Sequence, residues 1–158
     1  MLNYPTMVDV DTGLFTIGVF QNAEWAAKGI NALRAARFPA EAFSMIAKDE
    51  PAVAALVEQT CGGAPERLEV AFVGPIVARG PLVAALQGDS RDFAKLGIAA
   101  TMRRVGYQPH DGRIYETLVG RGGVLVAIKS DPRASDALAI LMSYGGGNAA
   151  IGAWGGRV

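Results

Sequence analysis

The one place in this chain where a histidine and a carboxylate adjoin is His110-Asp111, with Glu116 shortly after it. An imidazole and carboxylates are groups that bind metal ions or exchange protons near neutral pH. Adjacent residues on a helix point in different directions, however, and Asp111 is already explained as a favourable charge near a helix N-terminus. We therefore predict no metal site and no acid–base pair at this position, and no cofactor for the chain.

Cysteine chemistry is the second possibility. Cys61 is the only cysteine, and it stands at the end of a predicted helix beside Gly62-Gly63. A catalytic thiolate needs a nearby base, and His110 is the only histidine that the fold could bring to it. With no catalytic cluster in view, we expect a protein without enzymatic activity.

A binding site is the third possibility. Arg121 could anchor an anion near His110 or Tyr144, so these three residues are our candidate ligand-binding residues, for a small molecule that is unknown. The glycines at 120–123 lead into a strand, whereas a phosphate-binding loop precedes a helix whose N–H groups face the anion. The glycines at 145–147 follow a helix and are better explained as its C-cap and turn.

Composition limits the partners. Fifteen basic and fifteen acidic residues in 158 give a formal net charge of zero, so no basic field is present to attract nucleic acid. The longest apolar stretch, Val70 to Ala78, is far shorter than the ~20 residues that a membrane-spanning helix needs, and membrane association is not expected. A lone cysteine and an N-terminus with two aspartates and no basic segment predict a cytoplasmic protein.

The elements that would position these residues fall into two similar units, residues 14–48 and 123–153. Each combines a strand, a helix and a second strand, judged from period-two and helical spacing of apolar residues. The run Val124 to Ile128 is apolar and β-branched, which is typical of a strand covered on both faces and central in its sheet. We expect Asp131 and Pro132 to start the helix after it, and a short last strand at Ala149 to Ala153.

The fold class predicted from these units is α+β and ferredoxin-like: two β-α-β halves in a four-stranded sheet with two helices on one face. A single domain would cover residues 14–153, with a central insertion at about 50–122. Within the insertion we predict a helix begun by Pro51, extended segments in 68–82 that form a hairpin or an added edge strand, one helix over 92–105 and another from Pro109 to Gly120.

Several glycine and aliphatic motifs carry a family resemblance. They are Gly74-Pro75-Ile76-Val77-Ala78-Arg79-Gly80-Pro81-Leu82, the helix around Leu96-Gly97-Ile98, and Tyr115 shortly before Arg121-Gly122-Gly123-Val124-Leu125-Val126. In these, and in its opening strand and helix, the chain resembles the general stress protein 17M-like (heat-induced stress protein) domain family of bacteria over about residues 14–153. The resemblance implies a stress-associated protein without an established activity and offers no catalytic residues.

Two functional hypotheses follow. The first is a non-enzymatic stress-response domain that works as a homo-oligomer, because the chain is 51% hydrophobic and glycine-rich, with twenty glycines, and its predicted helix over 92–105 is apolar on two faces. The alternative is a small-ligand-binding module or cofactor-independent enzyme with a cleft between the sheet and the insertion, an analogy with other folds of this class.

Overall fold

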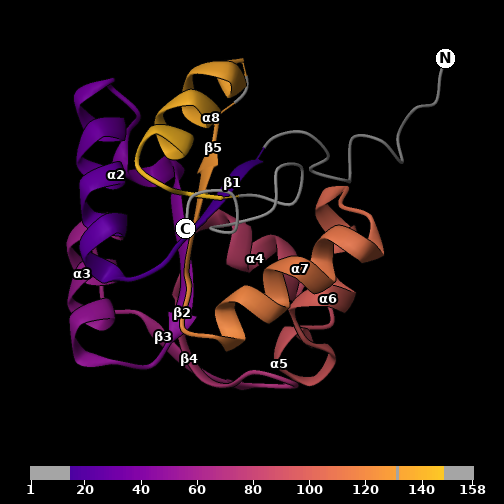
Figure 1. Ribbon diagram of the computed structural model, residues 1–158. Helices are drawn as coiled ribbons and strands as arrows, with labels where there is room; N and C mark the ends of the chain where they lie inside the picture. The colour runs from indigo at the N-terminus through magenta and orange to yellow at the C-terminus, as the bar shows by residue number, and fades with distance from the viewer. Residues whose placement is uncertain (1–14, 131, 148–158) are drawn as a thin grey trace, which may run out of the picture.

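An antiparallel sheet of five strands runs through the part of the chain that the computed structural model describes, residues 15–130 and 132–147 (Figure 1). The strand order is β1-β5-β2-β4-β3, and every pair of neighbours is antiparallel. The strands are β1 (Phe15–Phe20), β2 (Phe43–Lys48), β3 (Glu66–Val70), β4 (Gly74–Arg79) and β5 (Val124–Lys129).

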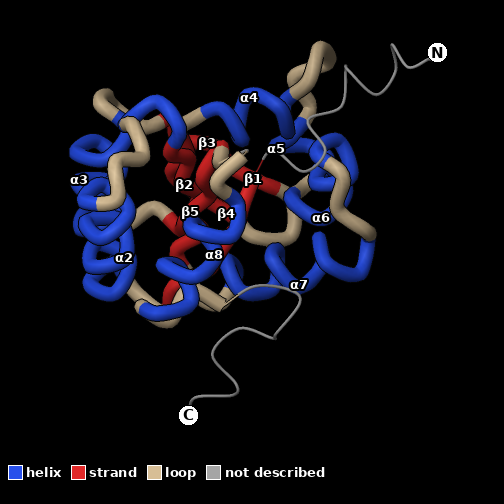
Figure 2. The backbone as a smooth tube through the Cα atoms, turned by 90° about the horizontal axis from the view of Figure 1, so that it is seen from above, coloured by secondary structure: helices blue, strands red, loops and turns tan. Residues whose placement is uncertain are grey.

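Helices cover both faces of this sheet. On one face lie α2 (Ala23–Ala35), α3 (Pro51–Cys61) and α8 (Ala134–Ser143), and on the other α4 (Pro81–Gln87), α5 (Phe93–Leu96), α6 (Ile98–Thr101) and α7 (Pro109–Gly120). Two short 3-10 turns, η1 (Ala40–Ala42) and η2 (Met102–Val105), complete the described elements. Seen from above, α2 and α3 lie on one side of the strands and α5 to α7 on the other, so the fold has three layers (Figure 2).

The central strand β5 shows why the sheet needs two helical layers. Val124, Val126 and Ile128 pack against the α2, α3 and α8 layer, whereas Leu125 and Ala127 pack against the α4 to α7 layer. All five side chains are at most 1% exposed. An apolar strand buried on both faces cannot lie at a wet margin, and β5 is indeed paired with β1 on one side and β2 on the other.

The crossover connections do not all have the same hand. The connection from β1 to β2 through α2 and the one from β2 to β3 through α3 both join parallel strands across one intervening strand, and both pass over the same face. The connection from β4 to β5 also joins parallel strands. These two strands are antiparallel to β1, β2 and β3, and the connection crosses the sheet in the opposite direction to the first two connections. The two reversals cancel, so the face covered by a crossover of a given hand is unchanged. A crossover of the same hand would again lie beside α2 and α3. Because α4 to α7 lie on the opposite face, this connection has the opposite hand, and one hand accounts for about 98% of such crossovers.

The chain enters the α4 to α7 layer at one tight corner, Gly80. Its φ is +118°, a region that residues with a side chain rarely adopt, and a Cβ there would lie 2.4 Å from the carbonyl oxygen of Phe43. Two residues later the backbone N–H of Leu82 donates a 2.8 Å hydrogen bond to Oγ of Ser44, which is fully buried in β2. Helix α4 is therefore capped by a serine from the neighbouring strand, in place of a side chain of its own N-cap residue.

Several expectations from the sequence are confirmed. The α+β class, β5 as a central strand and a helix from Pro109 to Gly120 are all found. Asn22 caps α2 by accepting the N–H of Trp25, and Pro51 begins α3. Segment 66–79 forms a hairpin whose first strand, β3, is an edge strand, as one of the two alternatives for 68–82 predicted.

The four-stranded ferredoxin-like arrangement is not confirmed, because the described sheet has five strands and helices on both faces. The segment expected as an insertion, about 50–122, supplies two of those strands, and β4 lies inside the sheet. Periodicity alone could not show this, since it gives no information on pairing partners. The expected last strand at 149–153 lies outside the described residues.

Three local predictions were wrong. The helix expected over 92–105 is broken into α5, α6 and η2, because Gly97 has a φ of +94° and cannot continue a helix. The extended segment expected to reach Leu82 ends at Arg79, since Pro81 opens α4. Helix α8 begins at Ala134, with Arg133 as its N-cap residue, rather than at Pro132.

Replacement of Gly80 by alanine tests the corner. We expect Gly80→Ala to lower the free energy of unfolding by at least about 3 kcal/mol, because the new Cβ would meet backbone atoms of β2 at a strained φ. Urea denaturation measures the change. In the matched control, Gly120→Ala, the Cβ enters open space at the end of a helix, and the effect should stay within about 1 kcal/mol. Equal stability of the two variants would contradict the described corner.

Candidate functional site

A cavity of about 340 Å³ opens at one end of the sheet, and we call it the sheet-end cleft. It lies where β4 ends, β2 and β3 begin, and α3 ends, with α4 along one wall. The cleft therefore lies between the end of the sheet and helices α3 and α4, both of which belong to segment 50–122. Its polar lining residues are Glu41, Glu66, Arg79, Gln87 and Arg91, and apolar lining comes mainly from Phe43, Cys61, Ala78 and Val83.

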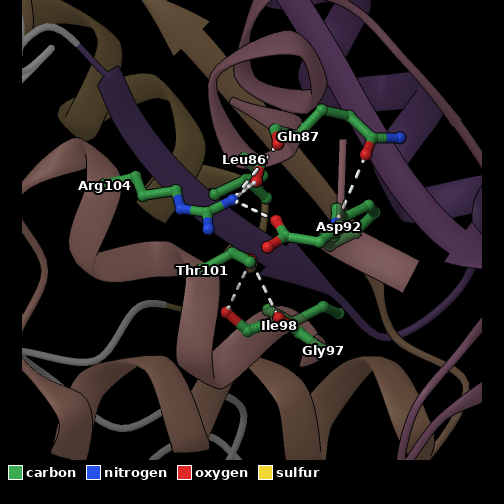
Figure 3. Close-up of polar contacts among 8 residues, drawn as sticks. Leu86, Gln87, Asp92, Gly97, Ile98, Thr101 and Arg104 are labelled. Carbon is green, nitrogen blue, oxygen red and sulfur yellow. Dashed lines mark hydrogen bonds and ion pairs between the residues drawn. The ribbon is translucent and has the colours of Figure 1, made fainter. Parts of the chain in front are cut away.

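The most buried polar side chain of the cleft is Gln87, which is only 5% exposed. Its Oε1 accepts a 3.3 Å hydrogen bond from the backbone N–H of Phe93. That bond fixes the orientation of the amide, because only the oxygen can accept. In the described part of the chain Nε2 has no hydrogen-bond partner, and Figure 3 shows this nitrogen on the side away from Arg104. Gln87 thus presents an unused donor at the cleft.

Arg79 supplies an uncompensated positive charge. One guanidinium nitrogen, Nη1, donates a 3.0 Å hydrogen bond to the carbonyl oxygen of Ala64. The guanidinium lies against Gly63, where a Cβ would be 2.6 Å from Nη2 and would displace the end of the arginine side chain. Among the described residues no carboxylate forms an ion pair with Arg79. Its remaining N–H groups are available to an anion.

The carboxylates of the cleft differ in their pairing. Glu66 lies 3.8 Å from Arg91, an exposed ion pair that contributes little to stability. Glu41, on η1, has neither an ion pair nor a side-chain hydrogen bond within the described ranges 15–130 and 132–147. After the pairing of Glu66 with Arg91, one unpaired cation and one unpaired anion are left, Arg79 and Glu41.

Arg104 holds the wall that carries Gln87. Its Nη1 donates to the carbonyl oxygens of Leu86 and Gln87, at 2.7 and 3.2 Å, and to Oδ1 of Asp92 at 2.7 Å (Figure 3). An arginine on the last carbonyls of a helix is favourable because these oxygens lack helical partners. The hydrogen bond from Arg104 also holds the pKa of Asp92 below its usual range. Helix α4 is thus fixed at its first turn by Ser44 and at its last by Arg104.

Cys61 lines the cleft as a thiol. Its Sγ–H points at the carbonyl oxygen of Phe43, 3.7 Å away. Burial raises the pKa of Cys61 to about 11, although the positive charges of Arg79 and Arg34 lower it in part. Near neutral pH the group is protonated, which makes it a poor nucleophile and a small apolar surface. His110 is not among the residues that line this cleft.

The three residues predicted from the sequence are not all brought together. His110, in the first turn of α7, and Arg121, its C-cap residue, are both exposed and line a shallow depression of about 400 Å³ together with Arg113 and Thr117. Tyr144 follows α8 in the other helical layer and packs against the core beneath it. The site predicted from His110, Arg121 and Tyr144 is therefore divided between two faces of the sheet.

The carboxylates near His110 have other roles. Oε2 of Glu116 accepts the backbone N–H of Ala99 at 3.1 Å and so joins α7 to α6. Asp111 lies in the first turn of α7, as expected for a charge that is favourable at a helix N-terminus. Within the described residues, no group of three or more histidine, cysteine, aspartate or glutamate side chains could hold a metal ion.

Sequence reasoning missed Glu41, Arg79 and Gln87. Glu41 is far from the other two in the chain, no chemical motif links the three, and the pairing of β2 with β4 brings them to one cavity. One local signal was present: Arg79 ends a buried apolar strand and stands directly before Gly80-Pro81, where the chain must turn.

Comparison with known proteins adds no assignment to this geometry. No family model matches the chain, and neither a curated protein nor a solved structure matches it. Among the described residues, no helix combines the length and apolar character that crossing a bilayer requires.

Alkylation of Cys61 by iodoacetamide tests the environment of the cleft. We expect the rate to rise with pH up to about 11, because burial disfavours the reactive thiolate at lower pH. The same chain unfolded in urea should level off near the ordinary thiol pKa of about 8.5 and react far faster at pH 8. A folded-state profile that levels off near pH 8.5 would show that the thiol is not buried as described.

Proposed function

We propose that this protein is a small-molecule-binding module and that the sheet-end cleft is its binding site. The observation that carries the proposal is the unused amide nitrogen of Gln87, a side chain 5% exposed that lines a cavity of about 340 Å³. Among the described residues no fully buried side-chain nitrogen or oxygen lacks a hydrogen-bond partner, so this nitrogen reaches the solvent of the cleft, where it is available to donate to a bound molecule in place of water.

The volume, lining and fixed wall of the cleft also support a small-molecule-binding function. Small-molecule sites are concave, mostly apolar, and carry a few fixed polar groups, and both the volume and the lining of the cleft fit this description. The wall is held by hydrogen bonds at both ends of α4, which keeps the donor of Gln87 in place without a ligand. Because the thiol of Cys61 is protonated near neutral pH, the lining groups are suited to binding rather than to covalent catalysis.

Filling the cleft tests this function. Ala84 is exposed on α4 and lines the cavity, so Ala84→Trp should fold and occupy the space. In a fragment screen followed by ¹H–¹⁵N spectra, we expect fragments that shift the amides around the cleft, and a loss of at least tenfold in their affinity in Ala84→Trp. The control is Ala55→Trp, on the exposed side of α3. If no fragment shifts the cleft amides, or if both variants bind alike, the proposed function is wrong.

Self-association is a second candidate, favoured by the outer face of α8. Leu138, Ala139 and Met142 line a shallow, mostly apolar depression of about 550 Å³ there, so this helix has apolar side chains facing away from the core as well as into it. A second copy of the chain could cover such a surface. Light scattering at micromolar concentration should show an oligomer in the wild type and a monomer in Leu138→Asp. A monomeric wild type would contradict this candidate.

The stress-protein relationship is a further proposal. It is supported by the roles of the motifs that carry the resemblance: Gly74-Pro75 opens β4, Gly80-Pro81 forms the corner before α4, and Arg121-Gly122-Gly123 precedes β5. A cytoplasmic location is proposed from the free thiol of Cys61.

A further inference from the structure

Of the charged residues that line the sheet-end cleft, Arg79 and Glu41 form no ion pair with any described residue, and they have opposite charges. We propose that the cleft binds a small zwitterion of the α-amino acid class, with its carboxylate at Gln87 and Arg79 and its ammonium group at Glu41. This inference rests on the proposed binding function and names the chemistry of the ligand.

The carboxylate end is defined by two donors. Nε2 of Gln87 is oriented by the bond that Oε1 accepts from Phe93, and the guanidinium of Arg79 is held on the Gly63-Ala64 segment by its bond to the carbonyl oxygen of Ala64. Both groups keep N–H donors without partners in the described part of the chain. A guanidinium fork matches the two oxygens of a carboxylate, and hydrogen bonds to a charged acceptor are stronger than neutral ones.

The ammonium end is defined by Glu41. This carboxylate stands on η1, the turn that leads into β2, and no described cation pairs with it. An ammonium group has three donors and no acceptor, so an unpaired carboxylate is its natural partner. The ammonium and carboxylate of an α-amino acid are on the same carbon, and the apolar lining residues Phe43, Ala78 and Val83 offer surface for the aliphatic side chain that extends from it.

Charge balance argues against other ligand classes. Glu66 and Arg91 pair with each other, which leaves one positive and one negative group for the ligand. A dianion would satisfy Arg79 but would be repelled by Glu41, and a dication would meet the reverse problem. A neutral apolar molecule would leave the donor of Gln87 unpaired in a drier site, which is unfavourable. A zwitterion satisfies all three groups at once.

Three matched probes test the inference: L-leucine, 4-methylpentanoate, which is leucine without its amino group, and 3-methylbutylamine, which is leucine without its carboxylate. Titrations followed by ¹H–¹⁵N spectra should show saturable shifts at the side-chain amide of Gln87 and the backbone around the cleft with L-leucine. Each truncated probe should bind at least tenfold more weakly, which corresponds to about 1.4 kcal/mol.

Two variants separate the ends of the ligand. Glu41→Gln should weaken L-leucine at least tenfold and leave 4-methylpentanoate unchanged, because only leucine has the ammonium group. Gln87→Glu keeps an oxygen for the N–H of Phe93 but replaces the donor by an anion, so it should weaken both carboxylate probes and spare the amine. Glu58→Gln and Gln59→Glu, exposed on α3 outside the cleft, are the matched controls and should bind like the wild type.

The outcomes distinguish this inference from the function on which it rests. The proposal of a zwitterionic ligand is wrong if 4-methylpentanoate or 3-methylbutylamine binds as tightly as L-leucine, or if Glu41→Gln has no effect on the affinity for leucine. The proposal that the cleft binds a small molecule is then still supported. If none of the three probes shifts the cleft amides but fragments excluded by Ala84→Trp do, the ligand class is wrong and the site remains. If nothing binds in the cleft, both proposals fall.

Discussion

The hydrogen bond between the buried Oγ of Ser44 and the backbone N–H of Leu82 fixes the start of α4 against β2, and the arrangement of the α4 to α7 layer depends on it. It joins the start of β2 to the first turn of α4, immediately after Gly80 has turned the chain out of β4. At this corner the chain leaves strand β4 and begins the helical layer on the face opposite α2 and α3. A positive φ at Gly80 and a cap from the neighbouring strand β2 begin a connection whose hand is opposite to that of the two earlier crossovers.

The two helical layers and the cleft follow from this corner. Because α4 to α7 lie opposite α2 and α3, every residue of β5 is buried except Lys129, and the sheet becomes the middle of three layers. Because α4 starts beside the beginning of β2, Gln87 and Arg79 come close to Glu41, although these residues belong to separate elements. The corner, braced further by Arg104 at the far end of α4, thus places the unpaired polar groups in one cavity.

Much of the fold was predictable from local signals, and the site was not. Apolar runs, Asn22, Pro51 and Pro109 located most strands and helices, since capping and periodicity act within a few residues. The face that α4 to α7 cover, the position of β4 inside the sheet and the break at Gly97 depend on long-range packing. His110 and Arg121 line one depression because both lie along α7 and its C-cap, whereas Tyr144 was placed near them only by a guess about tertiary structure.

The measurement that tests the central claim most directly is the amide hydrogen exchange of Leu82. The first N–H groups of a short helix normally lack partners and exchange fast. If Ser44 caps α4 as described, Leu82 should exchange slowly in the wild type and much faster in Ser44→Ala, while amides of β5 keep their protection. Fast exchange of Leu82 in the wild type, or no difference between the two proteins, would contradict the account of how this chain changes face and forms its cleft.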